Sequence, residues 1–311
     1  QFWADRSRTA AIAAHTNAFK VNEDVVIPLR NLAAYTEGIE TLNIRQSMQN
    51  KVRMIDAMLE HLAGDLPELR NIPDYEASEE SAAILANKIA HSVEFLKSRK
   101  ARWEAILANF NAPASEHMDL LDDTAKAAQR PQDRMIDLLL RRDLRISYRT
   151  EVVRPLQDIF VGRELEALLK TLEKIHGRIR SSRLFVALHM HAGDGNVHTN
   201  IPVNSNDYQM LQEAEHMVDE IMVLARSLDG VISGEHGIGL TKYQYLDKRE
   251  VDEFAAYKTK IDPKGHFNKG KLMPGSGLQD AYTPSLRLVE REALLLEHNE
   301  LGQLNHDIKD C

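Results

Sequence analysis

The stretch LHMHAGDGNVHTN, residues 188–200, limits the fold of this chain more than any other. Side chains alternate across a strand, so the residues before the turn form an apolar face and a second face that ends in His189 and His191. The segment AGDGN favours a chain reversal, because glycine tolerates positive φ and Asp and Asn favour turns. The returning strand carries His198 and Asn200 on one face. We expect a hairpin that can bring His191 and His198 side by side.

This histidine-rich hairpin predicts a metal site if a carboxylate lies nearby. Two neutral imidazoles and one carboxylate are a common open ligand set for zinc, manganese or ferrous iron. The segment SGEHGIG supplies Glu235 and His236 between two glycines, after apolar residues that predict a strand. The alternative interpretation is a surface hairpin with spare imidazoles and an exposed turn that carries a Glu–His pair.

Apolar residues at steps of three and four predict that residues 41–155 are helical throughout. The segments around Pro73 and Pro113 separate two long helices, and a further helix is expected through MIDLLLRRDLRI, residues 135–146. The basic stretch Arg141 to Arg149 alternates with acidic and apolar positions, which favours a solvated or partner-facing helix. The apolar and aromatic stripes indicate core packing rather than a cofactor site.

Strand and helix patterns in the rest of the chain predict an α+β fold, with an antiparallel sheet covered by helices and a long all-helical insertion. Val25 to Ile27 form a β-branched run stopped by Pro28, which predicts a strand. Amphipathic helices are expected over 163–179 and over 206–230, and Gly230 closes the second. The hairpin lies between these two helices. A last helix is expected within 276–311, as a linker toward a missing downstream module.

Composition excludes several classes of protein. A net charge of −8 argues against nucleic-acid binding, which needs a clustered basic face. No apolar run approaches the roughly 20 residues that cross a bilayer. The single cysteine, Cys311, allows no internal disulfide, so we expect a cytoplasmic protein, or one bound at the periphery of the inner membrane. Because the sequence starts without Met and ends on DIKDC, we expect a fragment of a longer polypeptide.

Three motifs resemble the C-terminal substrate domain of FAD-linked oxidases, a family that includes D-lactate, glycolate and D-2-hydroxyglutarate dehydrogenases. They are HAGDGNVH, ISGEHGIGLTK and DPKGHFNKGKL, in the family's order, while NEDVVIPL resembles its early strand. The resemblance covers residues 1–40 and 156–275. It implies a ferredoxin-like substrate or cap domain, into which residues 41–155 are inserted.

The resemblance also implies roles for individual residues. The metal ligands would be His191, His198 and Glu235, and the catalytic base would be His236. Substrate contacts would come from Asn200, Lys20 and Arg6, with Arg8 as a rival to Arg6, and Lys271 would lie near the flavin domain. Two departures stand out: His189 and Met190 replace an aromatic or aliphatic residue and a glycine, and Lys269 replaces the usual proline. We expect a supporting role for His189 rather than ligation.

The activity that the resemblance implies is oxidation of a D-2-hydroxy acid to the 2-oxo acid, with hydride transfer to FAD. The flavin domain would precede this chain in the same polypeptide, so the fragment alone should be inactive. A cysteine cluster that begins at Cys311 could form an iron–sulfur electron acceptor; an ordinary thiol is the alternative. The competing functions are a flavin-independent hydrolase or lyase that uses the same metal ligands, and a non-enzymatic docking platform.

Overall fold

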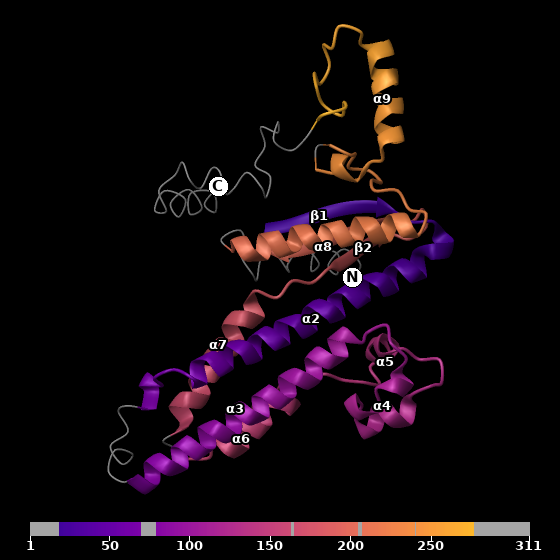
Figure 1. Ribbon diagram of the computed structural model, residues 1–311. Coiled ribbons are helices and arrows are strands. Elements are labelled where there is room, and N and C mark those ends of the chain that lie inside the picture. The colour runs from indigo at the N-terminus through magenta and orange to yellow at the C-terminus, as the bar shows by residue number, and fades with distance from the viewer. Residues whose placement is uncertain (1–18, 70–78, 163–164, 205–206, 240, 277–311) are drawn as a thin grey trace, which may run out of the picture. The chain divides into compact units, whose positions relative to one another are not determined.

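The computed structural model of the chain describes residues 19–69, 79–162, 165–204, 207–239 and 241–276 (Figure 1). The chain divides into two compact units. Unit 1 combines the residues up to Tyr35 with those from Ala187 onward, and unit 2 comprises Thr36–Val186. Within the described ranges, no helix has the length and apolar character needed to cross a membrane.

Unit 1 contains a three-stranded antiparallel sheet in the order β1-β3-β2. Its strands are β1 (Phe19–Val26), β2 (Ala187–His191) and β3 (Asn196–Val203). Val25, Val197 and Ile201 lie on one face of the sheet and are fully buried. Helix α8 (Tyr208–Ser227) contacts β1 and β3 with its own apolar face (Figure 1). The sheet is thus apolar toward α8, and the α+β fold class is confirmed.

The turn between β2 and β3 requires glycine at position 195. Gly195 has a φ of 78°, and a Cβ built there would lie 2.1 Å from the carbonyl oxygen of Ile27. The Ile27 N–H donates to the Gly195 carbonyl at 2.9 Å. Any side chain would therefore disrupt both the left-handed backbone and this contact.

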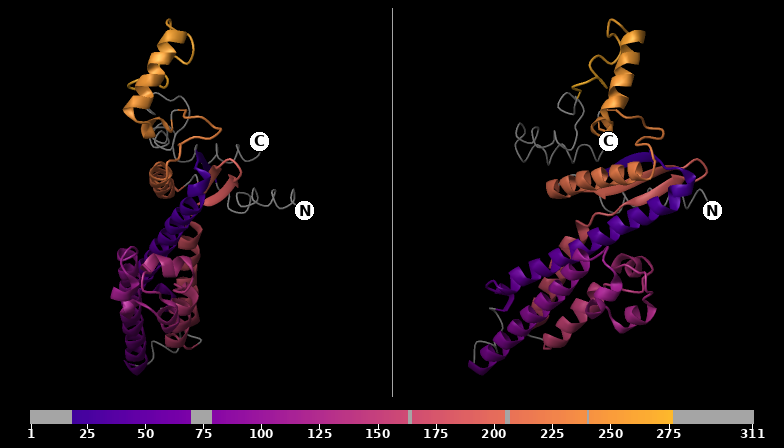
Figure 2. Two further views of the ribbon diagram at one scale, coloured as in Figure 1. Left: turned by 90° about the vertical axis from the view of Figure 1, so that its right-hand side faces the viewer. Right: turned by 45° about the vertical axis from the view of Figure 1, so that its right-hand side comes forward.

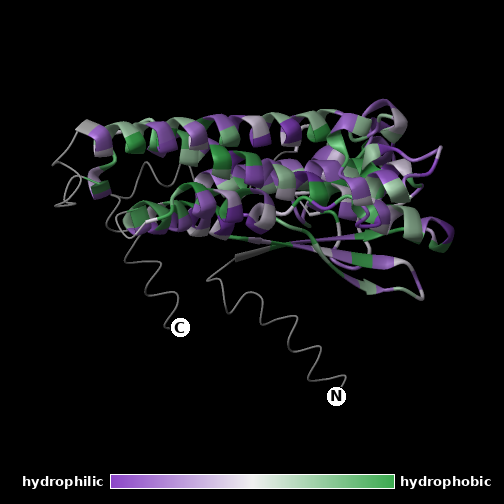
Figure 3. Cartoon of the chain, turned by 90° about the horizontal axis from the view of Figure 1, so that it is seen from below, coloured by the Kyte–Doolittle hydropathy of each residue, from purple (hydrophilic) through white to green (hydrophobic). Residues whose placement is uncertain are grey.

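Unit 2 is helical. Its elements include most of α2 (Leu32–Leu62), then α3 (Glu79–Ala108), α4 (Asp123–Ala128), α5 (Met135–Leu140), a π-helical turn (Arg149–Val153), α6 (Arg154–Ile159) and α7 (Glu166–Ser181). The two long helices α2 and α3 run side by side in both views of Figure 2, and Lys100 of α3 contacts Asp56 of α2 at 2.5 Å. The helices in Figure 3 carry both hydrophobic and hydrophilic residues along their length. The core includes Trp103 and Met58, both fully buried.

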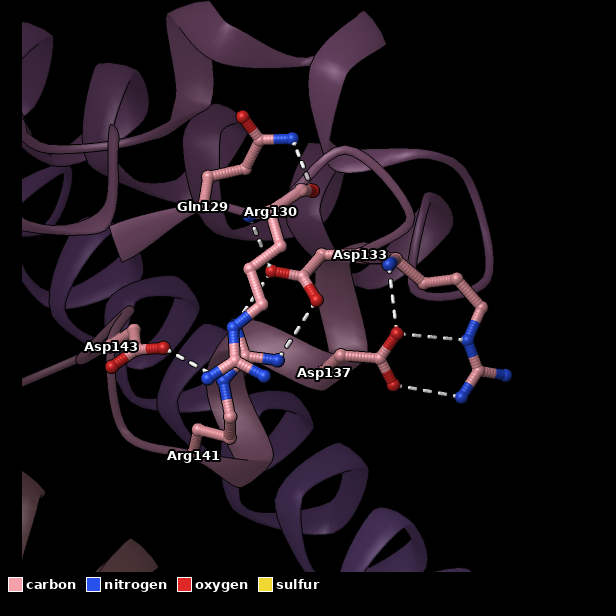
Figure 4. Close-up of polar contacts among 7 residues, drawn as sticks. Gln129, Arg130, Asp133, Asp137, Arg141 and Asp143 are labelled. Atoms are coloured by element: carbon pink, nitrogen blue, oxygen red, sulfur yellow. Dashed lines mark hydrogen bonds and ion pairs between the residues drawn. The ribbon is translucent and has the colours of Figure 1, made fainter. Parts of the chain in front are cut away.

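The prediction of a helix through 135–146 and on to Arg149 is wrong after Leu140. Helix α5 ends there, and Arg142 takes a left-handed φ of 64°. The Arg141 guanidinium turns back to donate to both carboxylate oxygens of Asp133, at 2.9 and 2.6 Å (Figure 4). Asp133 is 4% exposed, and the hydrogen bonds from Arg141 hold its pKa below the usual range. This forked ion pair fixes the turn that ends the helix.

The strand predicted before the SGEHGIG segment is also absent. Val231 forms only an isolated bridge to Val26, with backbone hydrogen bonds of 2.9 Å in both directions. Beyond that bridge the chain forms a loop, because its amide groups are bound by a side chain rather than by a neighbouring strand. Helix α9 (Lys248–Ile261) was not predicted, although Asp247 and Glu250 form a capping box at its start.

Candidate metal and catalytic site

The face of the sheet opposite to Val25 and Val197 is polar. The register places Asp24 of β1, His198 of β3 and His189 of β2 in one row. The adjacent row aligns Val26, Asn196 and His191. Because paired residues of antiparallel strands project to the same side, the imidazoles of the hairpin gather on this face.

His191, His198 and Glu235 converge on this polar face. Each offers one nitrogen or oxygen ligand atom, and the three atoms lie within 4.8 Å of one another. The ring centroids of His191 and His198 are 5.7 Å apart, and His198 Nε2 lies 2.7 Å from Glu235 Oε1. The set comprises two imidazole nitrogens and one carboxylate oxygen, with His191 and Glu235 both exposed. This donor set fits a divalent ion with positions left open to a substrate.

His198 is the buried member of the cluster, at 8% exposure. Burial lowers the pKa of its imidazole below the usual 6.5, and the nearby carboxylate of Glu235 only partly opposes this effect. Burial therefore favours the neutral imidazole, which is the form that binds a metal.

His189 faces His198 directly across the β2–β3 pair, but it does not belong to the group of three. Its ring centroid lies 6.0 Å from that of His198 and 5.9 Å from that of His191. The structure thus brings the imidazole of His189 beside two candidate ligands.

His236 follows Glu235 in the loop and lies over the same face of the sheet. Its ring centroid is 5.1 Å from that of His198, and its Nε2 is 4.0 Å from Glu235 Oε1. The side chain is 44% exposed. An imidazole that is both adjacent to the candidate ligands and open to solvent can exchange a proton with a molecule bound there.

The other predicted site residues lie at varying distances from this cluster. Asn200 is on β3, two residues after His198 and on the same face of the sheet, and its buried Oδ1 has no hydrogen-bond partner among the described residues. Lys20 belongs to β1, where its backbone pairs with Pro202. Lys271 is exposed in a turn after α9. Arg6 and Arg8 lie outside the described residues.

Two residues that the sequence did not single out support the loop from Gly234 to His236. Asp24 is fully buried and accepts hydrogen bonds from the backbone of all three loop residues. Lys242, 3% exposed, forms an ion pair with Asp24. The sequence alone shows little sign of this role. Asp24 stands beside a β-branched run, and its partner Lys242 is 218 residues away, so their contact becomes visible only in the folded chain.

Comparison with known proteins identifies the segment that carries this site. Residues 148–272 match the family of FAD linked oxidases, C-terminal domain. This segment, which is less than half of the chain, is similar to that family. It contains the hairpin, the loop with Glu235 and His236, and the turn with Lys271.

Curated relatives are also similar to part of this chain. Mitochondrial D-lactate dehydrogenase (cytochrome) of Arabidopsis thaliana is 32% identical over 114 residues, which are 35% of this chain and 20% of that protein. Glycolate oxidase subunit GlcD of Escherichia coli (strain K12) is 38% identical over 112 residues, 35% of this chain and 22% of that protein. Mitochondrial D-2-hydroxyglutarate dehydrogenase of Danio rerio is 39% identical over 88 residues, which are 27% of this chain and 16% of that protein. The matched segment thus spans at most about a quarter of the relatives' length.

Proposed function

We propose that this chain is the substrate- and metal-binding part of a flavin-dependent dehydrogenase that oxidises a D-2-hydroxy acid to the 2-oxo acid. FAD would be held mainly by another domain of the same polypeptide. The observation that carries the proposal is the convergence of His191, His198 and Glu235 within a segment of the FAD-linked oxidase family. The relatives named D-lactate dehydrogenase, glycolate oxidase and D-2-hydroxyglutarate dehydrogenase support the substrate class.

The three converging side chains would hold a divalent ion such as zinc, manganese or iron. When bound, the ion would act as a Lewis acid toward the carboxylate and hydroxyl oxygens of the substrate, and FAD would be the hydride acceptor. Burial lowers the pKa of His198, which favours the neutral imidazole for this role, and the exposed side of the cluster would admit the substrate.

His236 would accept the hydroxyl proton at one of its ring nitrogens. Its ring lies next to His198 and is half open to solvent, so a bound hydroxyl can reach it and the proton can leave to water. Asn200 would offer to the substrate its amide hydrogens or its Oδ1, which has no hydrogen-bond partner in the described part of the chain. Arg6, or Arg8 in its place, and Lys20 would neutralise the substrate carboxylate.

Flavin reduction tests this function in the full-length polypeptide. The purified protein should be yellow and should bleach without oxygen on addition of D-lactate, glycolate or D-2-hydroxyglutarate, and L-lactate serves as the stereochemical control. Removal of metal with a chelator should slow the bleaching, and added Zn²⁺ or Mn²⁺ should restore it. A colourless protein with metal-dependent hydrolase or lyase activity would contradict the proposal, as would flavin that none of the three acids reduces.

A further inference from the structure

The loop that carries Glu235 and His236 is bound to the sheet by one carboxylate. Asp24 Oδ2 accepts the backbone N–H of Gly234 at 2.7 Å, of Glu235 at 2.5 Å and of His236 at 3.1 Å. Asp24 is 0% exposed and stands opposite His198 in the β1–β3 register. Three successive amides of an irregular segment thus find their acceptor on one buried side chain.

Close approach of the loop to the sheet requires Gly234. A Cβ at this position would lie 2.3 Å from Asn196 Oδ1 and 3.1 Å from Asp24 Oδ2. The loop therefore rests directly on the polar face of the sheet, between β1 and β3. Its backbone cannot move away from the sheet without losing its hydrogen bonds to Asp24.

Lys242 compensates the buried charge of Asp24. Its Nζ donates to Asp24 Oδ1 at 2.5 Å and to the Asp24 carbonyl at 2.8 Å, and it lies 3.3 Å from Glu23 Oε2. The lysine is 3% exposed and contacts the edge strand β1. Burial alone would raise the pKa of Asp24, but hydrogen bonds from Lys242 and from the Glu235 and His236 amides lower it well below the usual range.

Asp24 has little bonding capacity left for a metal. A carboxylate offers about four lone pairs, and Oδ2 is shared by three amides while Oδ1 is bound by Lys242. His236 Nδ1 lies 3.8 Å from Oδ1, which is too long for a hydrogen bond. The carboxylate is thus committed to backbone and lysine contacts, and it acts on the site through the residues that it holds.

We propose that Asp24, neutralised by Lys242, is a positioning residue that fixes the Gly234–His236 loop so that Glu235 reaches His198 and His236 stays beside them. This inference deepens the proposed function and depends on it for the identity of the bound ion. Partners of this kind orient ligands, and their loss typically lowers metal affinity by about 10–100-fold.

Metal binding by variants of the full-length protein tests the positioning role. Apo protein is titrated with Zn²⁺ against a chelator for wild type, Asp24→Ala, Asp24→Asn and Lys242→Met. The control is Asp207→Ala, which removes a carboxylate that accepts the Met210 N–H at 3.0 Å at the start of α8. We expect a loss of affinity of about 10–100-fold in Asp24→Ala, a smaller loss in Asp24→Asn, which keeps an acceptor oxygen, and wild-type affinity in the control.

Two further measurements separate positioning from general stability. Amide hydrogen exchange of a peptide spanning residues 232–239 should accelerate in Asp24→Ala and stay unchanged in the control, with or without metal. Thermal unfolding identifies variants that lose affinity only because they lose the fold. Wild-type exchange in this peptide, or wild-type Zn²⁺ affinity in a folded Asp24→Ala protein, would overturn the inference.

The same titration distinguishes this inference from the proposed function. If wild type binds no Zn²⁺, the proposed function fails, and the exchange experiment still decides whether Asp24 holds the loop. If wild type binds Zn²⁺, His191→Ala loses it and Asp24→Ala retains it fully, the proposed metal site stands and the positioning role fails.

Discussion

His198 Nε2 lies 2.7 Å from Glu235 Oε1, so a strand of the hairpin and a loop that follows α8 meet at one polar contact. The imidazole is 10% exposed and the carboxylate 51% exposed. His198 is thus buried, whereas Glu235, and His191 on the adjacent row of the sheet, are exposed. The cluster of these three side chains is therefore open to solvent on one side. This asymmetry favours a site that takes a small ligand from solvent over a closed structural metal site.

Replacement of His191 should remove the metal, whereas replacement of His189 should not. His191 belongs to the converging group, and His189 lies beside it on the same strand without offering a ligand atom to that group. We expect metal content to fall from about one ion per chain to near zero in His191→Ala, because two ligands rarely retain a divalent ion. Elemental analysis of the full-length variants measures this, with His189→Ala as the matched control. Equal losses in the two variants would contradict the ligand assignment.

His236→Ala should abolish turnover while the metal stays bound. His236 is close to the converging side chains but is not one of them. Loss of a general base lowers kcat by about 10²–10⁴-fold. Rates of flavin reduction and metal content, measured on the same preparation, check this outcome. Turnover close to that of wild type would remove His236 from the mechanism, and loss of the metal would assign it a ligand role instead.

The sequence predicts the hairpin and the long helices well, because their apolar residues recur at the regular spacing of a strand or of a helix. The apolar steps that begin at Ile44 correspond to α2, and the alternation of residues 188–200 corresponds to β2 and β3. The prediction fails after Leu140, where the helix ends and Arg141 bonds to Asp133. A single ion pair of this kind produces no periodic pattern of residues, so the sequence does not reveal it. It also fails at residues 231–233, where apolar composition suggests a strand but only one bridge forms.

The residues of the candidate site could be named from the sequence, but the residues that hold them in place could not. Glu235 and His236 stand out because a carboxylate and an imidazole lie between two glycines. Asp24 and Lys242 do not, because an isolated Asp and an isolated Lys are usually exposed. Their pairing depends on β1 being the edge strand beside the loop, which is a property of the folded sheet.

Glu151→Ala should destabilise unit 2. The Glu151 side chain is 16% exposed, and its Oε2 accepts hydrogen bonds from Arg102 at 2.8 Å and from Trp103 at 3.2 Å. Truncation leaves the buried indole N–H and a half-buried guanidinium without this acceptor. We expect a loss of about 2–3 kcal/mol of unfolding free energy, measured by urea denaturation. The exposed Glu94→Ala on α3 is the control, with a change within about 0.5 kcal/mol. Equal stability of the two variants would contradict the assigned role.

Unit 2 should also become less stable as the pH falls, in part because of His176. The imidazole stacks on Tyr148 with ring centroids 4.2 Å apart, and burial lowers its pKa from 6.5, with Arg180 adding to the effect and Glu173 opposing it. Charged residues also line the adjacent cavity of about 680 Å³; they are Arg149, Glu166, Lys170, Glu173 and Arg180. Because the folded-state pKa is the lower one, the unfolded chain binds more protons between that pKa and 6.5. The unfolding free energy should therefore fall as the pH drops through this window.

His176→Phe isolates this contribution, because phenylalanine keeps a stacked ring but cannot titrate. Urea denaturation between about pH 7.5 and about pH 5.5 should show a smaller loss of stability in His176→Phe than in wild type. The matched control is His91→Gln on α3, which removes an exposed imidazole and should retain the wild-type pH dependence. Identical pH profiles for wild type and His176→Phe would show that protonation of this imidazole costs the folded state nothing. The stack on Tyr148 would then stabilise the charged and the neutral ring equally.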